Sequence, residues 1–112
     1  MRISNNFNRF YHSLLGEIYK QLKNPLRFEG IGVIYVANLE QLKMVCKLLN
    51  LDYPRDALGE PISTRDISNK KLVEHIEYLI KLAYQNGYEI SAVEAEWRKL
   101  LNENNYTITK ID

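Results

Sequence analysis

The sequence predicts an α+β protein that is mostly helical, with about four helices and a small two-stranded sheet formed either within the chain or across a dimer. Three observations support this class. Apolar residues recur at helical spacing in four segments, capping residues precede several of them, and two short β-branched runs lie far apart in the chain. With 112 residues, of which 46% are hydrophobic, we expect a single domain, residues 1–112, with one core.

The first predicted helix is marked by an apolar stripe at positions i, i+3, i+4, i+7, i+11 and i+15. The stripe consists of Phe7, Phe10, Tyr11, Leu14, Ile18 and Leu22. Ser4 or Asn5 can cap its start. Asn24 precedes Pro25, and because the residue before a proline avoids the α conformation, we expect the helix to stop there.

Two strands are predicted. The run "GIGVIYV", residues 30–36, is β-branched and aromatic and is bounded by glycine, and its continuous apolar character predicts burial on both faces. The run "YTITKI", residues 106–111, is the second. Since two short strands are not stable alone, we expect them to pair with each other or with a second subunit.

The second predicted helix begins after Asn38, a typical N-cap residue, with Gln41 at capping-box spacing. Its apolar stripe comprises Leu39, Leu42, Cys46 and Leu49. It should end near Asn50. Residues 52–67 contain two prolines and a glycine without periodicity, which predicts a loop.

Ser68 should cap a third helix, and Asn86-Gly87 should end it because glycine tolerates the left-handed C′ conformation. Ser91 and Glu94 have capping-box spacing and predict the start of a fourth helix. The buried stripe of the third helix contains Leu72, Ile76, Leu79 and Ala83, broadened by Val73, Ile80 and Tyr84. The fourth helix continues through Trp97, Leu100 and Leu101.

The formal net charge is only +1, so the protein as a whole has no strong electrostatic attraction to nucleic acid or to membranes. Residues 1–50 nevertheless carry +4 and the remainder −3, which predicts a basic face on the N-terminal half. A single cysteine excludes an intrachain disulfide and a multi-cysteine zinc site and fits a reducing compartment. With neither a secretory leader nor a membrane-length apolar run in the sequence, we expect a cytoplasmic protein.

Nothing in the sequence predicts an enzyme, a cofactor or a metal site. His12 and His75 lie far apart, no serine has a nucleophile-elbow context, and Cys46 lies within an apolar stripe that favours a buried structural thiol. His75 has Lys71 and Leu79 at i−4 and i+4, so it lacks a metal-ligand partner on its own helix.

Basic residues interleaved with aromatics in the N-terminal quarter are typical of single-stranded nucleic acid binding, with cations for phosphates and rings for bases. The rings are Tyr11, Tyr19 and Phe28, and the cations are Arg9, Lys20, Lys23 and Arg27. The alternative is that these rings belong to the core.

The stretch "GEPISTRDISNKKL", residues 59–72, contains a second candidate for phosphate contact. Lys70 and Lys71 occupy the first turn of the third helix, where cations oppose the helix dipole. An anion held there by free N–H groups, Ser68, the two lysines and nearby Arg65 would compensate them. The alternative is a capped helix with solvated lysines and Asp66 nearby.

Residues 59–91 resemble the C-terminal region of the NinB (Orf) family of phage recombination proteins. The likeness lies in the Ser63-Thr64 element, the capped start Ile67-Ser68 and the closing turn at residues 86–88. A preceding helix with a cysteine, here Cys46, is also similar, so that the likeness covers about half of the chain. The resemblance implies a dimeric, non-enzymatic phage or mobile-element protein that binds single-stranded DNA and assists recombination.

A protein-interaction module that binds and inhibits a host protein is the alternative hypothesis. Near-zero net charge and a surface rich in tyrosine and asparagine favour it. In either case we expect a homodimer, since two separated strands in a short, 46% hydrophobic chain leave apolar surface that a twofold interface would bury.

Overall fold

The computed structural model describes residues 5–23, 25–104 and 106. These residues form an α+β fold that is mostly helical, as predicted. Its helices are α1 (Asn5–Gln21), α2 (Leu39–Leu49), α3 (Asn69–Gln85) and α4 (Ser91–Glu103). An antiparallel hairpin of β1 (Leu26–Phe28) and β2 (Gly32–Ile34) follows α1.

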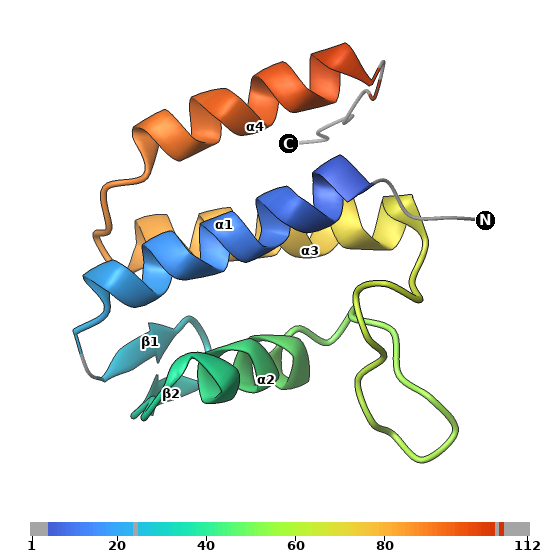
Figure 1. The fold of residues 1–112 in the computed structure, drawn as a ribbon. Coiled ribbons are helices and arrows are strands. Elements are labelled where there is room, and N and C mark those ends of the chain that lie inside the picture. Colours follow the sequence, from blue (N-terminus) through green and yellow to red (C-terminus); the bar gives the residue numbers. More distant parts are fainter. Residues whose placement is uncertain (1–4, 24, 105, 107–112) are drawn as a thin grey trace.

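Helix α1 lies in the middle of the molecule and packs against α2, α3 and α4 (Figure 1). Its two ends are tied to the two ends of α3. Thr64, just before α3, donates to Asn8 Oδ1 at 2.8 Å, and Gln21 exchanges two 2.8 Å hydrogen bonds with the backbone of Glu89, just after α3. The two helices therefore run parallel, with both N-termini at one end of the molecule.

Most helix boundaries follow the predicted capping chemistry. Asn38 Oδ1 accepts from the N–H of Gln41 at 2.8 Å, and Ser68 Oγ accepts from the N–H of Lys71 at 3.2 Å. Helix α3 ends at Gln85 with Asn86 as its C-cap, and Gly87 follows with φ of 74°, a left-handed conformation that favours glycine.

The predicted capping box of the fourth helix is wrong. Ile90 occupies the N-cap position without a side-chain bond, and Ser91 is already the first helical residue. The backbone N–H of Ser91 donates to the carboxylate of Glu89 at 2.9 Å, and the carboxylate of Glu94 accepts from Tyr84 and Arg98. Contacts with neighbouring side chains have replaced the local capping interaction.

The sheet contains a strand that was not predicted, and it differs from the prediction in its burial. Strand β2 pairs with β1 in a local hairpin, in the register Leu26↔Ile34 and Phe28↔Gly32. Most of the second predicted run, residues 106–111, lies outside the described residues. Expected burial on both faces is wrong, because Val33 and Tyr35 are 52% and 70% exposed.

The loop before α3 is held by specific bonds although its sequence has no periodicity. Arg55 donates to the carbonyl of Leu48 at 2.6 Å, where a cation suits the C-terminus of α2. Tyr53 donates to the carbonyl of Ile62, and Thr64 docks on α1. Ser63 and Asp66 form a turn just before α3, in which the N–H of Asp66 donates to the Ser63 carbonyl at 2.9 Å.

No helix among the described residues combines the length and apolar character that would be needed to cross a bilayer.

Candidate functional site

The eight residues predicted to contact nucleic acid divide between the two ends of the parallel α1–α3 pair. Five belong to the end that holds the N-termini of the two helices. They are Arg9, Arg65, Ser68, Lys70 and Lys71. The other three lie at the C-terminal end, namely Lys20, Lys23 and Arg27. Along α1 the separation of Arg9 and Lys20 is about 16 Å, at about 1.5 Å per residue.

At the N-terminal end, two of the groups expected to hold an anion already have partners. Ser68 Oγ accepts the capping bond from the backbone of Lys71. The ammonium of Lys71 lies 3.4 Å from the carboxylate of Glu74. These contacts match the capped helix start that was the alternative interpretation of this stretch.

At the C-terminal end, Lys20 and Lys23 line a hollow of about 460 Å³ together with Gly87 and Tyr88. Lys20 also lies 3.8 Å from Glu17. Arg27 reaches this end through its backbone, which exchanges hydrogen bonds of 2.8 and 2.9 Å with the side chain of Asn86. Cations near the C-termini of α1 and α3 interact favourably with the helix dipoles, so their position has a structural explanation.

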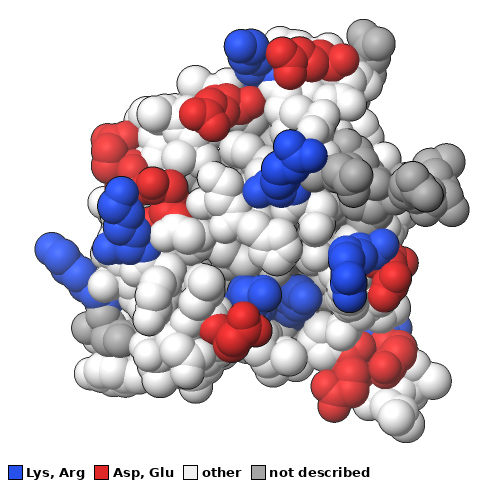
Figure 2. All heavy atoms as spheres, in the orientation of Figure 1, with Lys and Arg blue, Asp and Glu red and all other residues white. Residues whose placement is uncertain are grey.

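Basic and acidic side chains alternate on the face of the molecule that Figure 2 shows, and neither sign forms a continuous field there. The charge asymmetry of the sequence therefore does not become a single-sign patch on this face.

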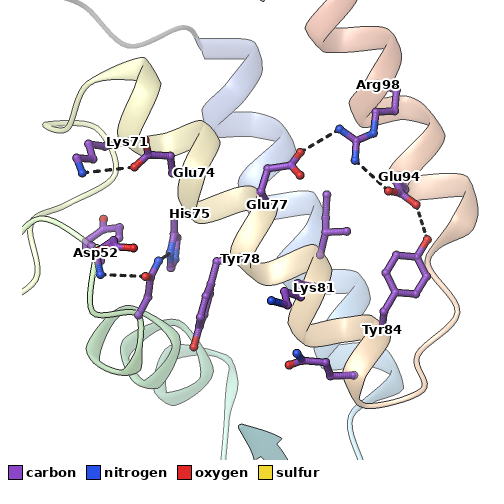
Figure 3. A pocket seen from close by; sticks show the side chains of 14 residues that line it. Asp52, Lys71, Glu74, His75, Glu77, Tyr78, Lys81, Tyr84, Glu94 and Arg98 are labelled. Atoms are coloured by element: carbon purple, nitrogen blue, oxygen red, sulfur yellow. Dashed lines mark hydrogen bonds and ion pairs between the residues drawn. The ribbon is translucent and has the colours of Figure 1, made fainter. Parts of the chain in front are cut away.

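A larger concave surface lies over α3. It is a groove of about 670 Å³ with α3 as its floor, the segment after α2 along one side and α4 along the other (Figure 3). Its lining includes Asp52, Tyr53, Glu77, Tyr78, Lys81, Tyr84, Glu94 and Arg98.

The wall formed by α4 is a network of charged hydrogen bonds. Arg98 donates to Glu77 at 3.2 Å and to Glu94 at 3.1 Å, so one guanidinium joins α3 to α4. Glu77 also accepts from the indole N–H of buried Trp97, and Glu94 accepts from the hydroxyl of Tyr84. The bond to Glu94 raises the pKa of Tyr84. This wall is fixed before any ligand arrives.

On the opposite side of the groove, buried His75 of α3 lies between Tyr53, which belongs to the wall after α2, and Tyr78 of α3. Its ring centroid lies 4.6 Å from that of Tyr53 and 5.9 Å from that of Tyr78. Asn50 Oδ1 accepts from the N–H of Asp52, so its Nδ2 donates to His75 Nδ1 at 2.9 Å. The proton of the neutral imidazole is thereby assigned to Nε2, which has no hydrogen-bond partner among the described residues.

Burial, followed by the charge of Lys47, lowers the pKa of His75 to about 3. Burial likewise raises the pKa of Tyr78 to about 12. The imidazole is therefore neutral and the phenol protonated at neutral pH. Both present uncharged rings to the groove.

Two charged groups of the groove have no ion pair within the described part of the chain. They are the ammonium of Lys81, on the floor, and the carboxylate of Asp52, on the wall beside His75. Both are on exposed residues and available to a ligand.

The sequence prediction missed this groove, although one signal for it was present. The residues at positions 71, 74, 78, 81 and 85 follow helical spacing on the face of α3 opposite the buried stripe. Tyr78, a large aromatic residue, interrupts an otherwise polar face there. The walls come from segments distant in sequence, which no local pattern reveals.

No group of three or more His, Cys, Asp and Glu side chains suited to a metal ion occurs within residues 5–23, 25–104 and 106. Cys46 is buried, as predicted, and burial raises the pKa of its thiol to about 12.

Neither a protein-family model, nor a curated protein, nor a solved structure matches the chain. The resemblance to the NinB family stays a prediction.

Proposed function

We propose that this chain is a protein-interaction module that holds a segment of a partner protein in the groove over α3. The observation that supports this proposal is the gathering of Tyr53, Tyr78, Tyr84 and Arg98 around one concave surface of about 670 Å³. Tyrosine and arginine are the residue types that most often dominate protein–protein binding energy.

The groove favours an apolar or aromatic anchor side chain. Half-buried Tyr78 and exposed Tyr84 offer aromatic surface to a ligand. Tyr53, Ile80 and neutral His75 also line the groove but are almost completely buried. Around this surface the charges nearly balance, with four carboxylates against three cations. Because Asp52 is the carboxylate without an ion pair in the described structure, we expect a basic residue beside the anchor of the partner segment.

Preorganisation also supports binding at this surface. Arg98 is held by Glu77 and Glu94, and Tyr84 is held by Glu94. Side chains that are already fixed lose little rotamer entropy when a ligand binds, and this loss is about 0.5–1.5 kcal/mol for each freely moving side chain. Binding of a partner to this wall should therefore cost little side-chain entropy.

Selection of peptides from a display library on the wild-type protein tests this proposal. Two exposed groove residues, Lys81 and Tyr84, are changed in the variants Lys81→Glu and Tyr84→Ala. Matched controls on α1 are Lys20→Glu and Tyr19→Ala, because Tyr19 and Tyr84 are similarly exposed, at 39% and 44%. Affinities of the selected peptides are then measured by isothermal titration calorimetry.

We expect each groove variant to weaken binding by about tenfold or more, while the α1 controls keep wild-type affinity. Peptides that bind all four variants equally, or a library that yields no peptide for the wild type, would overturn the proposal.

Single-stranded nucleic acid binding is the second candidate, and one observation favours it. The N-termini of α1 and α3 lie at the same end of the molecule, neither helix has an acidic residue in its first turn, and Arg9, Arg65 and Lys70 surround them. Parallel helix dipoles and cations would together attract phosphates there.

Fluorescence anisotropy of a labelled oligonucleotide at several salt concentrations tests this candidate. With about four phosphates neutralised, the slope of log affinity against log salt should be about −3, from roughly 0.7 per contact. Changing Lys70 and Lys71 to alanine should flatten the slope by up to about 1.5, whereas changing Lys20 and Lys23 should not. Undetectable binding at low salt would end the nucleic-acid hypothesis.

A further inference from the structure

We propose that the free edge of β2 pairs with β2 of a second copy of this chain, about a twofold axis at Val33, to form a four-stranded antiparallel sheet. The surface for this contact is the segment from Ile31 to Tyr35. It lies outside the set of residues that line the α3 groove, so that the proposal does not depend on the proposed function.

The outer edge of β1 has hydrogen-bond partners within the chain, whereas none is found for the outer edge of β2 in the described structure. On β1, the side chain of Asn86 accepts from the N–H of Arg27 at 2.8 Å and donates to its carbonyl at 2.9 Å. These bonds cover the outer edge of β1 much as another strand would. They also show that the peptide groups of Arg27 point away from β2.

The orientation of Arg27 determines that of Val33, its partner in the register. In an antiparallel pair, residues directly opposite each other direct their peptide groups either toward one another or both away. Since those of Arg27 point away, the N–H and carbonyl of Val33 also point outward. No hydrogen bond to this outer edge is found among the described residues.

Strand β2 is short, but it lacks the charged residues and prolines that usually protect an edge strand. Charged side chains, prolines and inward-facing charges discourage edge-to-edge pairing in natural sheets. The segment "GIGVIYV", residues 30–36, contains no charged residue and no proline. Its apolar residues at alternating positions are exposed, with Ile31 at 57%, Val33 at 52% and Tyr35 at 70%.

Self-complementarity identifies a second copy as the occupant. When two identical strands pair antiparallel about Val33, that residue faces its own copy, and Ile31 faces Tyr35 of the other chain. Every exposed apolar residue of the strand then acquires an apolar cross-strand neighbour, including two pairs of an aromatic with a β-branched residue.

Charge does not oppose this arrangement. Arg27 and its copy would lie on the two outer strands of the new sheet, about 14 Å apart at about 4.8 Å per strand spacing. That separation exceeds the screening length of about 10 Å at 0.1 M salt. Three side chains and one short strand from each copy bury less than the roughly 1,000 Å² of stable interfaces, so we expect a dissociation constant on the order of tens of micromolar.

Sedimentation equilibrium from low micromolar to about millimolar concentration tests the proposal, with wild type, Val33→Lys and Val33→Glu. Each variant alone places like charges opposite one another and should weaken self-association by about tenfold or more. Mixing the two variants should restore the dimer, because opposite charges then meet at position 33. Restoration also demonstrates that both variants are folded.

The matched control is Leu58→Lys, which also replaces an exposed aliphatic residue by lysine, at a position that is 89% accessible in the loop before α3. It should associate like the wild type. A wild type that is monomeric up to about millimolar concentration would overturn the proposal, as would a dimer that survives Val33→Lys or a mixture that stays monomeric.

Discussion

At the scale of single residues, the structural role of the buried Cys46 thiol can be tested by substitution. The thiol is fully buried on the inner face of α2, and burial raises its pKa to about 12. We expect Cys46→Ser to lower the free energy of unfolding by about 1–3 kcal/mol, because a buried hydroxyl needs a hydrogen-bond partner. Urea denaturation followed by circular dichroism measures this change.

The same thiol should react with a disulfide reagent far more slowly in the native protein than in urea, because the reactive form is the thiolate. Rapid labelling of the native protein, together with unchanged stability of Cys46→Ser, would show that the thiol is accessible. The prediction that Cys46 is a structural residue would then be wrong.

The buried imidazole of His75 predicts a pH dependence of stability. Its pKa falls from 6.5 to about 3, mainly through burial. Between pH 6.5 and pH 3 the imidazole is protonated in the unfolded state but stays neutral in the folded state. Proton binding therefore favours the unfolded state, and the free energy of unfolding decreases as the pH falls from 6.5 toward 3. When the pH is lowered from 7 to 5, we expect protonation of this histidine in the unfolded state to lower the free energy of unfolding by about 2 kcal/mol.

Denaturation at the two pH values for wild type, His75→Gln and His12→Gln separates this contribution from others. His12 is an exposed histidine, and burial and nearby lysines lower its pKa to a lesser degree. The loss of stability should persist in His12→Gln and become much smaller in His75→Gln. An unchanged loss in His75→Gln would assign it to other groups.

At the scale of elements, substitution of the two serines at the starts of α3 and α4 should reduce stability to different extents. Ser68 Oγ accepts the capping bond of α3, whereas Ser91 lies inside α4 and its own N–H donates to the carboxylate of Glu89. Ser68→Ala should therefore lower the free energy of unfolding by about 1 kcal/mol, and Ser91→Ala by much less. Parallel urea titrations measure both; equal losses would restore the capping-box interpretation of Ser91.

These elements also show how far the sequence could be interpreted. Apolar stripes and caps predicted all the described helices, because both signals act within a few residues of one another. Strand β1 escaped notice because "LRF", with Arg27 between two apolar residues, is too short a pattern to identify. Continuous apolar character in residues 30–36 was interpreted as burial, although part of it instead covers the outside of a hairpin.

At the scale of the whole molecule, the candidate site depends on packing that local patterns do not encode. Local signals placed Tyr78 and Lys81 on a helix, but only the tertiary fold brings Tyr53, Glu94 and Arg98 to the same groove. Likewise, the predicted basic residues of the N-terminal quarter are near one another in the sequence, yet α1 places Arg9 at one end of the molecule and the other three at the opposite end.

The prediction of one domain can be tested through α4 and its contacts with the other helices. Trp97, the only tryptophan, stacks on Phe10 with ring centroids 5.0 Å apart, and its indole N–H donates to Glu77 of α3. Because α4 is held by buried contacts to α1 and α3, we expect Trp97 fluorescence and far-ultraviolet circular dichroism to give coincident guanidinium transitions.

The same two probes report on the bond that joins α4 to α3. Glu77→Ala leaves the indole N–H of Trp97 without its acceptor and should cost about 1–3 kcal/mol, lowering both midpoints together. Glu74→Ala is the matched control, since Glu74 forms a half-exposed ion pair with Lys71 and its loss should cost less than about 1 kcal/mol. A fluorescence midpoint below that of circular dichroism, in wild type or in Glu77→Ala, would mean that α4 unfolds as a separate unit from the core built around α1.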